Sequence, residues 1–175
     1  NIWDAVSLFH FYSFVLTLII IISEAFKETI NKFGNLDIVV NNAGLYNEKK
    51  WKYEVAVSLN GVIHGTLMAL KYMDKSAGGK GGIVVNMSSI AGLGSETYVS
   101  AIHNATQSAV IELSRAFGSD NFYQTTGVRV MVICPGYTES EIIPHDQQQL
   151  LAMLYKDEWV DDFYNLIQRL SPQQK

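Results

Sequence analysis

Apolar runs of strand length alternate along most of the chain with longer stretches of helical period, which is the rhythm of a βαβ protein. Three runs are nearly continuous in apolar residues and predict buried strands of a parallel sheet, at 36–40, 83–87 and 128–134. Apolar positions between them recur every three or four residues and predict helices over 53–73 and 101–117. The pattern therefore indicates an α/β fold.

A further helix is predicted before the first strand. Ser23 can cap its first turn, and Phe26, Ile30 and Phe33 are spaced i, i+4 and i+7, which places them on one face. Gly34 follows directly and is a natural stop, because glycine adopts the left-handed conformation at a helix end. We expect this helix to cover part of the sheet.

The two ends of the chain depart from the alternation. No residue from Ala5 to Ser23 carries a formal charge, and this segment closes with four consecutive isoleucines. Its length admits a membrane helix, but β-branched isoleucines favour a strand, and we favour a buried strand or helix over a membrane span. Residues 147–170 predict one or two amphipathic helices. We therefore divide the chain into an atypical apolar segment, 1–23, and an α/β domain, 24–175.

The composition limits the kinds of partner and the cellular compartment that we expect for the protein. The formal net charge is −4 and the basic residues are scattered, which argues against nucleic acid as a partner. The single cysteine, Cys134, cannot form an intramolecular disulfide, and no Cys/His cluster suggests a metal site. A reducing, cytoplasmic location is expected.

Small and polar residues follow each of the three predicted strands. These segments are Asn41–Gly44, Ser88–Ser89 and Pro135–Thr138. The carboxyl ends of parallel strands share one rim of a sheet, which is where such sheets bind ligands. A serine hydroxyl at this rim can polarise a carbonyl group, and a glycine lets a flat ring approach the backbone.

At these strand ends the sequence resembles the short-chain dehydrogenases/reductases, which interconvert secondary alcohols and ketones with a nicotinamide cofactor. The resemblance covers roughly residues 24–143. The motifs that carry it are FGNLDIVVNNAG at 33–44, NEKKW at 47–51, SLN at 58–60, GKGGIVVNMSS at 79–89 and ICPG at 133–136. Each motif is weak alone, but their combination at these spacings is specific.

The resemblance implies a partial Rossmann-like, doubly wound parallel sheet that lacks the first βαβ unit. A complete Rossmann site has a glycine-rich turn after its first strand to receive the pyrophosphate. Here the earliest glycine is Gly34, so no such turn occurs in the sequence. We therefore expect the chain to be incomplete at both ends relative to the family. NAD(H) is the implied cofactor, and the missing turn counts against its binding.

Family roles carry over to particular positions. Along the cofactor, the resemblance places Asn41, Ala43, Gly44, Pro135, Gly136 and Ser140. Asn60 matches the asparagine of the proton relay, and Ser89 matches the serine that hydrogen-bonds the substrate oxygen. Asn60 could equally cap or bridge backbone groups.

The central dyad of the family, Tyr-x-x-x-Lys, is not present. A tyrosine hydroxyl has an ordinary pKa of about 10, and the lysine lowers it toward neutrality. Residues 81–155 contain no lysine. Anchored on the downstream helix, the dyad positions fall on His103 and Gln107, and a register shifted by one places them on Ile102 and Thr106.

Three functions remain open at this point. Imidazole titrates near pH 6.5 without a cationic neighbour, but it reaches less far than a phenol. We therefore expect an oxidoreductase that interconverts a secondary alcohol and a ketone, with impaired catalysis. The first alternative is a non-catalytic module that dimerises through the helices 53–73 and 101–117. The second is a membrane-anchored relative that uses the apolar segment.

Overall fold

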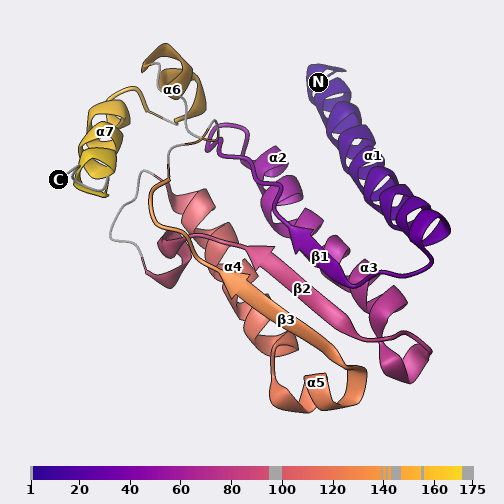
Figure 1. Ribbon diagram of the computed structural model, residues 1–175. Coiled ribbons are helices and arrows are strands. Elements are labelled where there is room, and N and C mark those ends of the chain that lie inside the picture. The colour runs from indigo at the N-terminus through magenta and orange to yellow at the C-terminus, as the bar shows by residue number, and fades with distance from the viewer. Residues whose placement is uncertain are drawn as a thin grey trace.

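A three-stranded parallel sheet lies at the centre of the computed structural model (Figure 1). The structure describes residues 2–94, 100–138, 140, 142, 147–154 and 156–170. The strands lie in the order β1 (Ile38–Asn41), β2 (Gly82–Met87) and β3 (Val128–Ile133). In the register, Asn41 pairs with Asn86, and Met87 with Ile133. The three predicted strands and their parallel pairing are confirmed to within a few residues at their ends.

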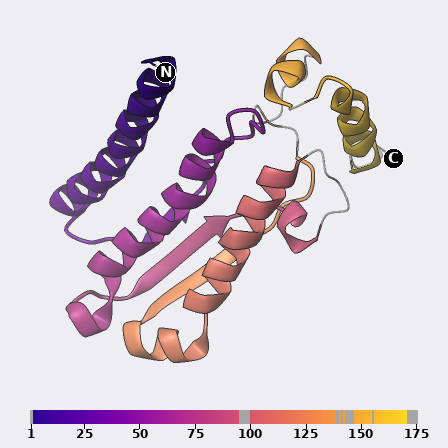
Figure 2. The same ribbon diagram turned by 180° about the vertical axis from the view of Figure 1, so that it is seen from behind.

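Helices connect the strands along one face of the sheet (Figures 1 and 2). Between β1 and β2 the chain forms α2 (Trp51–Val55), a π-helical segment η1 (Ala56–Gly61) and α3 (Val62–Met73), followed by the 3₁₀ turn η2 (Lys75–Ala77). Between β2 and β3 lie the 3₁₀ turn η3 (Ile90–Leu93), α4 (Ala101–Phe117) and α5 (Asp120–Thr126). The two predicted connecting helices are therefore confirmed, the first with a π-helical middle.

The main core fills the space between this helical layer and the sheet. Its buried members are Leu36, Val39, Ala69, Met73, Val84, Val128 and Val130. The opposite face of the same strands is open, and the side chains of Ile38, Val40, Ile83, Met131 and Ile133 are between 36% and 59% exposed. The expectation of fully buried strands is therefore wrong for one face, because no described helix packs on it.

The N-terminal segment and the predicted helix after it form one element, α1 (Ile2–Phe33). Of the strand or helix expected for the isoleucine run, the structure shows the helix, and the predicted helix start at Ser23 is wrong. Ser23 lies inside α1, and its Oγ is 3.2 Å from His64 Nε2 on α3. The predicted stop is confirmed, since Gly34 has φ +75° and donates its N–H to the Ile30 carbonyl at 2.7 Å.

Burial along α1 also differs from the expectation. Phe26 and Ile30 pack against the main core, but Phe33 at the end of the predicted stripe is exposed. Ile20 and Ile21 face solvent, so the isoleucine run is only partly covered. Intrinsic strand preference is weak and yields where one helical face can pack on a neighbour. Among the described residues, no helix, α1 included, is long and apolar enough to cross a membrane.

The predicted C-terminal helices are present as α6 (Gln147–Met153) and α7 (Trp159–Leu170). They form a second, smaller cluster with the loop that follows β1, in which Tyr46 packs against Leu150, Leu154 and Phe163. The rings of Tyr46 and Phe163 stack with their centroids 5.5 Å apart. The last two helices are thereby attached beside the carboxyl ends of the strands.

Candidate functional site

The three strand ends meet at one rim, as the sequence predicts. Beyond β2, Ser88 donates its backbone N–H to the Ile133 carbonyl at 2.8 Å, and Ile90 donates to the Pro135 carbonyl at 2.9 Å. These bonds extend the pairing of β2 and β3 past the strands and place Ser89 beside Pro135. Gly44, after β1, belongs to the same rim.

Small residues leave part of this rim open. A Cβ added to Gly136 would meet no atom of the described residues within 4 Å, whereas one at Gly44 would lie 3.4 Å from Ile142 Cδ1. Ala43 and Ser140 are exposed. A flat ring could therefore approach the backbone at the ends of β1 and β3, and these residues fit the nicotinamide end of a dinucleotide.

The side chain of Asn41 is directed into the helical layer. Its Nδ2 donates to Asn86 Oδ1 at 2.8 Å and to Thr66 Oγ1 at 3.2 Å, and Asn86 Nδ2 donates to Ser114 Oγ at 2.9 Å. A Cβ on Gly65 would lie 2.0 Å from Asn41 Oδ1, so a glycine makes room for this side chain. Asn41 thus ties β1 to its neighbours, and its backbone is the part that lies at the rim.

Ser89 begins the 3₁₀ turn η3. Its Oγ accepts a hydrogen bond from Ala91 N at 3.2 Å, and no described group accepts the hydrogen of its own hydroxyl. Ser88 instead donates its hydroxyl to the Gln107 carbonyl at 3.0 Å, which fastens this turn to α4. Ser89 is therefore placed where a substrate oxygen could accept from it.

Asn60 does not turn toward the rim. It lies in η1 with its side chain exposed, whereas Ser58 is buried in the same segment. Ser58 Oγ donates to the Leu45 carbonyl at 3.1 Å and accepts from Leu45 N at 2.9 Å. The residue of this segment that contacts the loop after β1 is thus Ser58, which the sequence reasoning did not select.

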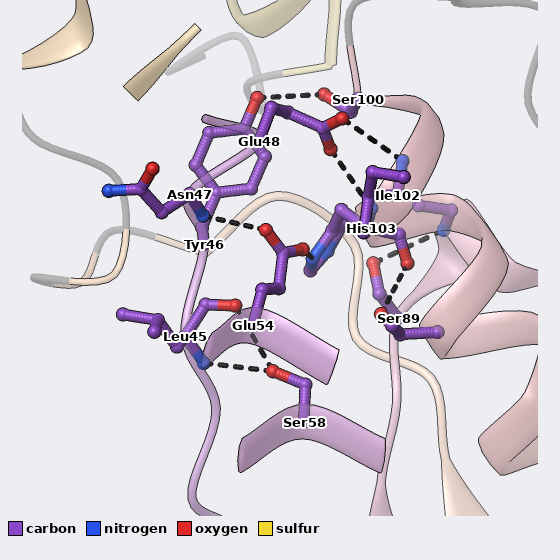
Figure 3. Close-up of polar contacts among 12 residues, drawn as sticks. Leu45, Tyr46, Asn47, Glu48, Glu54, Ser58, Ser89, Ser100, Ile102 and His103 are labelled. Atoms are coloured by element: carbon purple, nitrogen blue, oxygen red, sulfur yellow. Dashed lines mark hydrogen bonds and ion pairs between the residues drawn. The ribbon is translucent and has the colours of Figure 1, made fainter. Parts of the chain in front are cut away.

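His103 on α4 contacts the loop after β1 (Figure 3). Its ring meets Tyr46 edge to face at 5.4 Å, and its Nδ1 lies 3.4 Å from Glu54 Oε1. In the alternative register, Thr106 is buried and donates its hydroxyl to the His103 carbonyl at 2.8 Å. The side chain of Gln107 is also buried, so it offers little surface to a ribose.

Two buried glutamates complete the surroundings of His103, and the sequence reasoning missed both. Glu48 Oε1 accepts from His103 N at 3.0 Å, and its Oε2 accepts from Ile102 N at 3.1 Å (Figure 3). Glu48 therefore caps α4 in place of Ser100, whose hydroxyl is 3.0 Å from the Tyr46 hydroxyl. Burial raises the pKa of Glu48, which the two N–H groups oppose, and burial also raises the pKa of Tyr46.

Glu54 lies between the loop after β1 and the ring of His103. Its side chain is 0% exposed, and its Oε2 accepts from Asn47 N at 2.7 Å. A signal for this burial is present in the sequence. Glu54, Ser58 and Val62 are spaced by four, and all three lie on the buried face of the helical segment.

A parallel sheet with connecting helices, and with small and polar residues at its strand ends, defines a Rossmann-like α/β protein with its ligand site at that rim. The family model for short chain dehydrogenase matches residues 7–150. The chain therefore belongs to the short-chain dehydrogenase family, as its motifs predict.

Curated relatives agree with this assignment. Over 120 residues the chain is 40% identical to the NAD(+) 15-hydroxyprostaglandin dehydrogenase of Mus musculus, covering 69% of this chain and 44% of the relative. It is 38% identical to Fat body protein 2 of Drosophila melanogaster, and the match covers 70% of this chain and 47% of that protein. Alcohol dehydrogenase 1 of Ceratitis cosyra is 34% identical, and the match covers 69% of this chain and 47% of that protein. The chain thus spans somewhat less than half of the length of these relatives.

Solved structures show the same fold. A gluconate 5-dehydrogenase from Burkholderia cenocepacia J2315, in complex with NADP and tartrate, matches with a TM-score of 0.60 at 26% identity. The match covers 69% of this chain and 48% of that one. A short chain dehydrogenase from Mycobacterium smegmatis matches with a TM-score of 0.58 at 23% identity, covering 76% and 59%. The fold predicted from the sequence is confirmed.

Proposed function

We propose that this chain forms the substrate and nicotinamide part of an oxidoreductase that interconverts a secondary alcohol and a ketone with NAD(H), at a turnover below that of a Tyr-x-x-x-Lys enzyme. The observation that carries the proposal is the rim itself. Backbone bonds hold Ser89 beside Pro135, and open backbone at Gly136 adjoins them. The named relatives support the alcohol and ketone class.

Reduced turnover follows from the residues that replace the dyad. Residues 81–155 contain no lysine, and the family's tyrosine position falls on His103, whose shorter ring is held against Glu54. Proton transfer depends steeply on the distance and angle of the donor, and a misplacement of 1 Å costs about 100-fold. We therefore place the catalytic rate about two orders of magnitude below that of a Tyr-Lys enzyme.

The cofactor would lie over Ala43, Gly44 and Gly136, with Ser140 near its carboxamide. When bound, the nicotinamide supplies or accepts the hydride. The sequence has no glycine before Gly34 and so no glycine-rich turn to hold a pyrophosphate, and we expect NADH to bind weakly, in the millimolar range.

A fluorescence titration with NADH tests the proposal, with Gly136→Val as the matched variant. A Cβ at Gly136 meets no atom of the described residues within 4 Å, so valine there should occupy ligand space, and the melting temperature reports whether it also disturbs the protein. We expect saturable binding to the native chain, and binding at least about 10-fold weaker in the variant at an unchanged melting temperature. No saturable binding at millimolar NADH would show that the proposed function is wrong.

Two further expectations belong with this proposal. We expect a homodimer through the helices 53–73 and 101–117, and Leu67 on α3, which is 49% exposed, gives that face an apolar point of contact. We also expect a cytoplasmic location, given the single cysteine. A chain that dimerises without binding NADH would support the non-catalytic alternative.

A further inference from the structure

The buried carboxylate of Glu54 and the buried Nδ1 of His103 form a pair that no family role accounts for. Glu54 Oε1 and His103 Nδ1 are both buried, neither has a hydrogen bond to a third group in the described part of the chain, and they lie 3.4 Å apart. An uncompensated carboxylate in the interior is costly. The pair is satisfied when the shared proton lies on Nδ1 and faces Oε1.

The groups around the pair fix both side chains. The second oxygen of Glu54 is bound to Asn47 N at 2.7 Å, so the carboxylate cannot turn away. The backbone N–H of His103 is bound to Glu48, and the Tyr46 ring covers one edge of the imidazole (Figure 3). The ring is therefore held by Glu54 and Tyr46, and the backbone of His103 is held by Glu48.

One nitrogen of the ring remains available. His103 is 18% exposed, and only its Nδ1 is both buried and without a hydrogen bond. Because Nδ1 faces Glu54, Nε2 is the ring nitrogen left for a ligand. A proton held on Nδ1 leaves the Nε2 lone pair free in the neutral ring, which can then accept a proton, or give one when the ring is charged.

We infer that Glu54 is a positioning residue that holds the Nδ1–H of His103 and so directs Nε2 to exchange a proton with the substrate oxygen. The inference rests on the proposed function. In ketone reduction the Nε2–H bond of the imidazolium breaks and an O–H bond forms on the substrate, while a hydride from the reduced nicotinamide dinucleotide reaches the carbonyl carbon. The ring is left neutral with its proton on Nδ1, and water restores the second proton.

The tautomer of His103 tests the positioning directly and needs no cofactor. We would record the nitrogen resonances of ¹⁵N-histidine at pH 8 and assign His103 by their loss in His103→Gln. The native chain should carry the proton on Nδ1. In Glu54→Gln the amide oxygen must stay on Asn47 N–H, so the amide NH₂ faces the ring and the proton moves to Nε2.

Glu48→Gln is the matched control, because Glu48 is buried equally and contacts the backbone of His103 but not its ring. The tautomer should not change in this variant. A native His103 that carries its proton on Nε2 overturns the inference, and this measurement decides the matter even if Glu54→Gln does not fold. An unchanged tautomer in a folded Glu54→Gln overturns it as well.

Steady-state kinetics test the proton transfer. Glu54→Gln should lower kcat by at least about 10-fold and change KM less than twofold, because the effect is on proton exchange and not on substrate binding. An active native chain whose kcat does not depend on Glu54 overturns the inference alone. A native chain that neither binds NADH nor turns over overturns the proposed function, and the catalytic part of the inference with it.

Discussion

At the scale of the residue, Glu48 caps a helix that is far from it in the sequence, a role that short-range sequence patterns do not reveal. It accepts from two N–H groups in the first turn of α4, although Ile102 comes 54 residues later in the chain. The Ser100 hydroxyl adjacent to that helix is engaged with Tyr46 instead. The start of α4 therefore depends on a tertiary contact.

The titration of Glu48 should make stability depend on pH. Burial raises the pKa of Glu48 above its ordinary value of 4.5, so the folded chain holds this proton more tightly than the unfolded chain. Its contribution is full below pH 4.5 and is lost as the pH rises through the folded pKa. Urea unfolding from pH 4 to pH 7 should show the native chain losing stability relative to Glu48→Gln. A stability difference that does not vary with pH would contradict this.

Two glycines one turn apart offer a matched test of the Asn41 contacts. In Gly65→Ala the new Cβ would lie 2.0 Å from Asn41 Oδ1, and Asn41 is fixed by Asn86 and Thr66. We expect a loss of about 1–3 kcal/mol in the free energy of unfolding. In Gly61→Ala the nearest atom would lie 3.7 Å from the new Cβ. The higher helix preference of alanine should then raise the free energy of unfolding by about 0.5–1 kcal/mol. Equal effects in urea titrations would show that the Asn41 contacts are unimportant.

The parts of the candidate site that lie at strand ends or at positions matched by the family motifs could be predicted from the sequence. Ser89 and the open glycine at 136 lie at the expected rim, and His103 lies in its expected helix. Glu54 was missed because a carboxylate in a helix is read as solvent-facing unless its i, i+4 companions are examined. Asn60 was selected by its match to the family's relay asparagine, whereas helix geometry turns Ser58 inward.

At the scale of the element, α1 shows where local preference fails. Four isoleucines favour a strand, but they continue a helix whose other face packs on the core through Phe26 and Ile30. The strands could be predicted because apolar runs of that length have few alternatives once glycines bound them. The end of α1 could be predicted for a local reason, the positive φ of Gly34.

Substitutions along α1 should separate its two faces. Phe26 packs against the main core and stacks on Tyr72 at 6.1 Å, so Phe26→Ser should lower the free energy of unfolding by about 2–4 kcal/mol. Ile20 is 59% exposed, and Ile20→Ser should change the free energy of unfolding by less than about 1 kcal/mol. Urea unfolding followed by circular dichroism measures both. A large effect at Ile20 would show that this face of α1 is covered in solution.

At the scale of the whole molecule, the described helices cover one face of the sheet and leave the other open. Sequence alone could not show this, because a strand that is apolar on both faces looks the same whether one or both faces are packed. The open face gathers large apolar side chains from all three strands. Parallel sheets are ordinarily covered on both faces, so this surface is an exception within the described part of the chain.

A dye that binds apolar surface should report this face. The double variant Ile38→Lys and Ile133→Lys should lower the fluorescence of bound anilinonaphthalene sulfonate by at least about twofold, because both residues lie within the patch. Leu67→Lys is the control, since Leu67 is comparably exposed but lies on α3, away from the sheet. Equal reductions in the two proteins would show that the dye binds elsewhere.

The ring of Tyr46 lies between two parts of the molecule, with its centroid 5.4 Å from that of His103 and 5.5 Å from that of Phe163. His103 and α7 therefore share one packing partner, the Tyr46 ring. Trp159 belongs to the same cluster as Phe163, and indole emission is sensitive to its surroundings. The C-terminal helices are thus joined to His103 by direct packing, through the single ring of Tyr46.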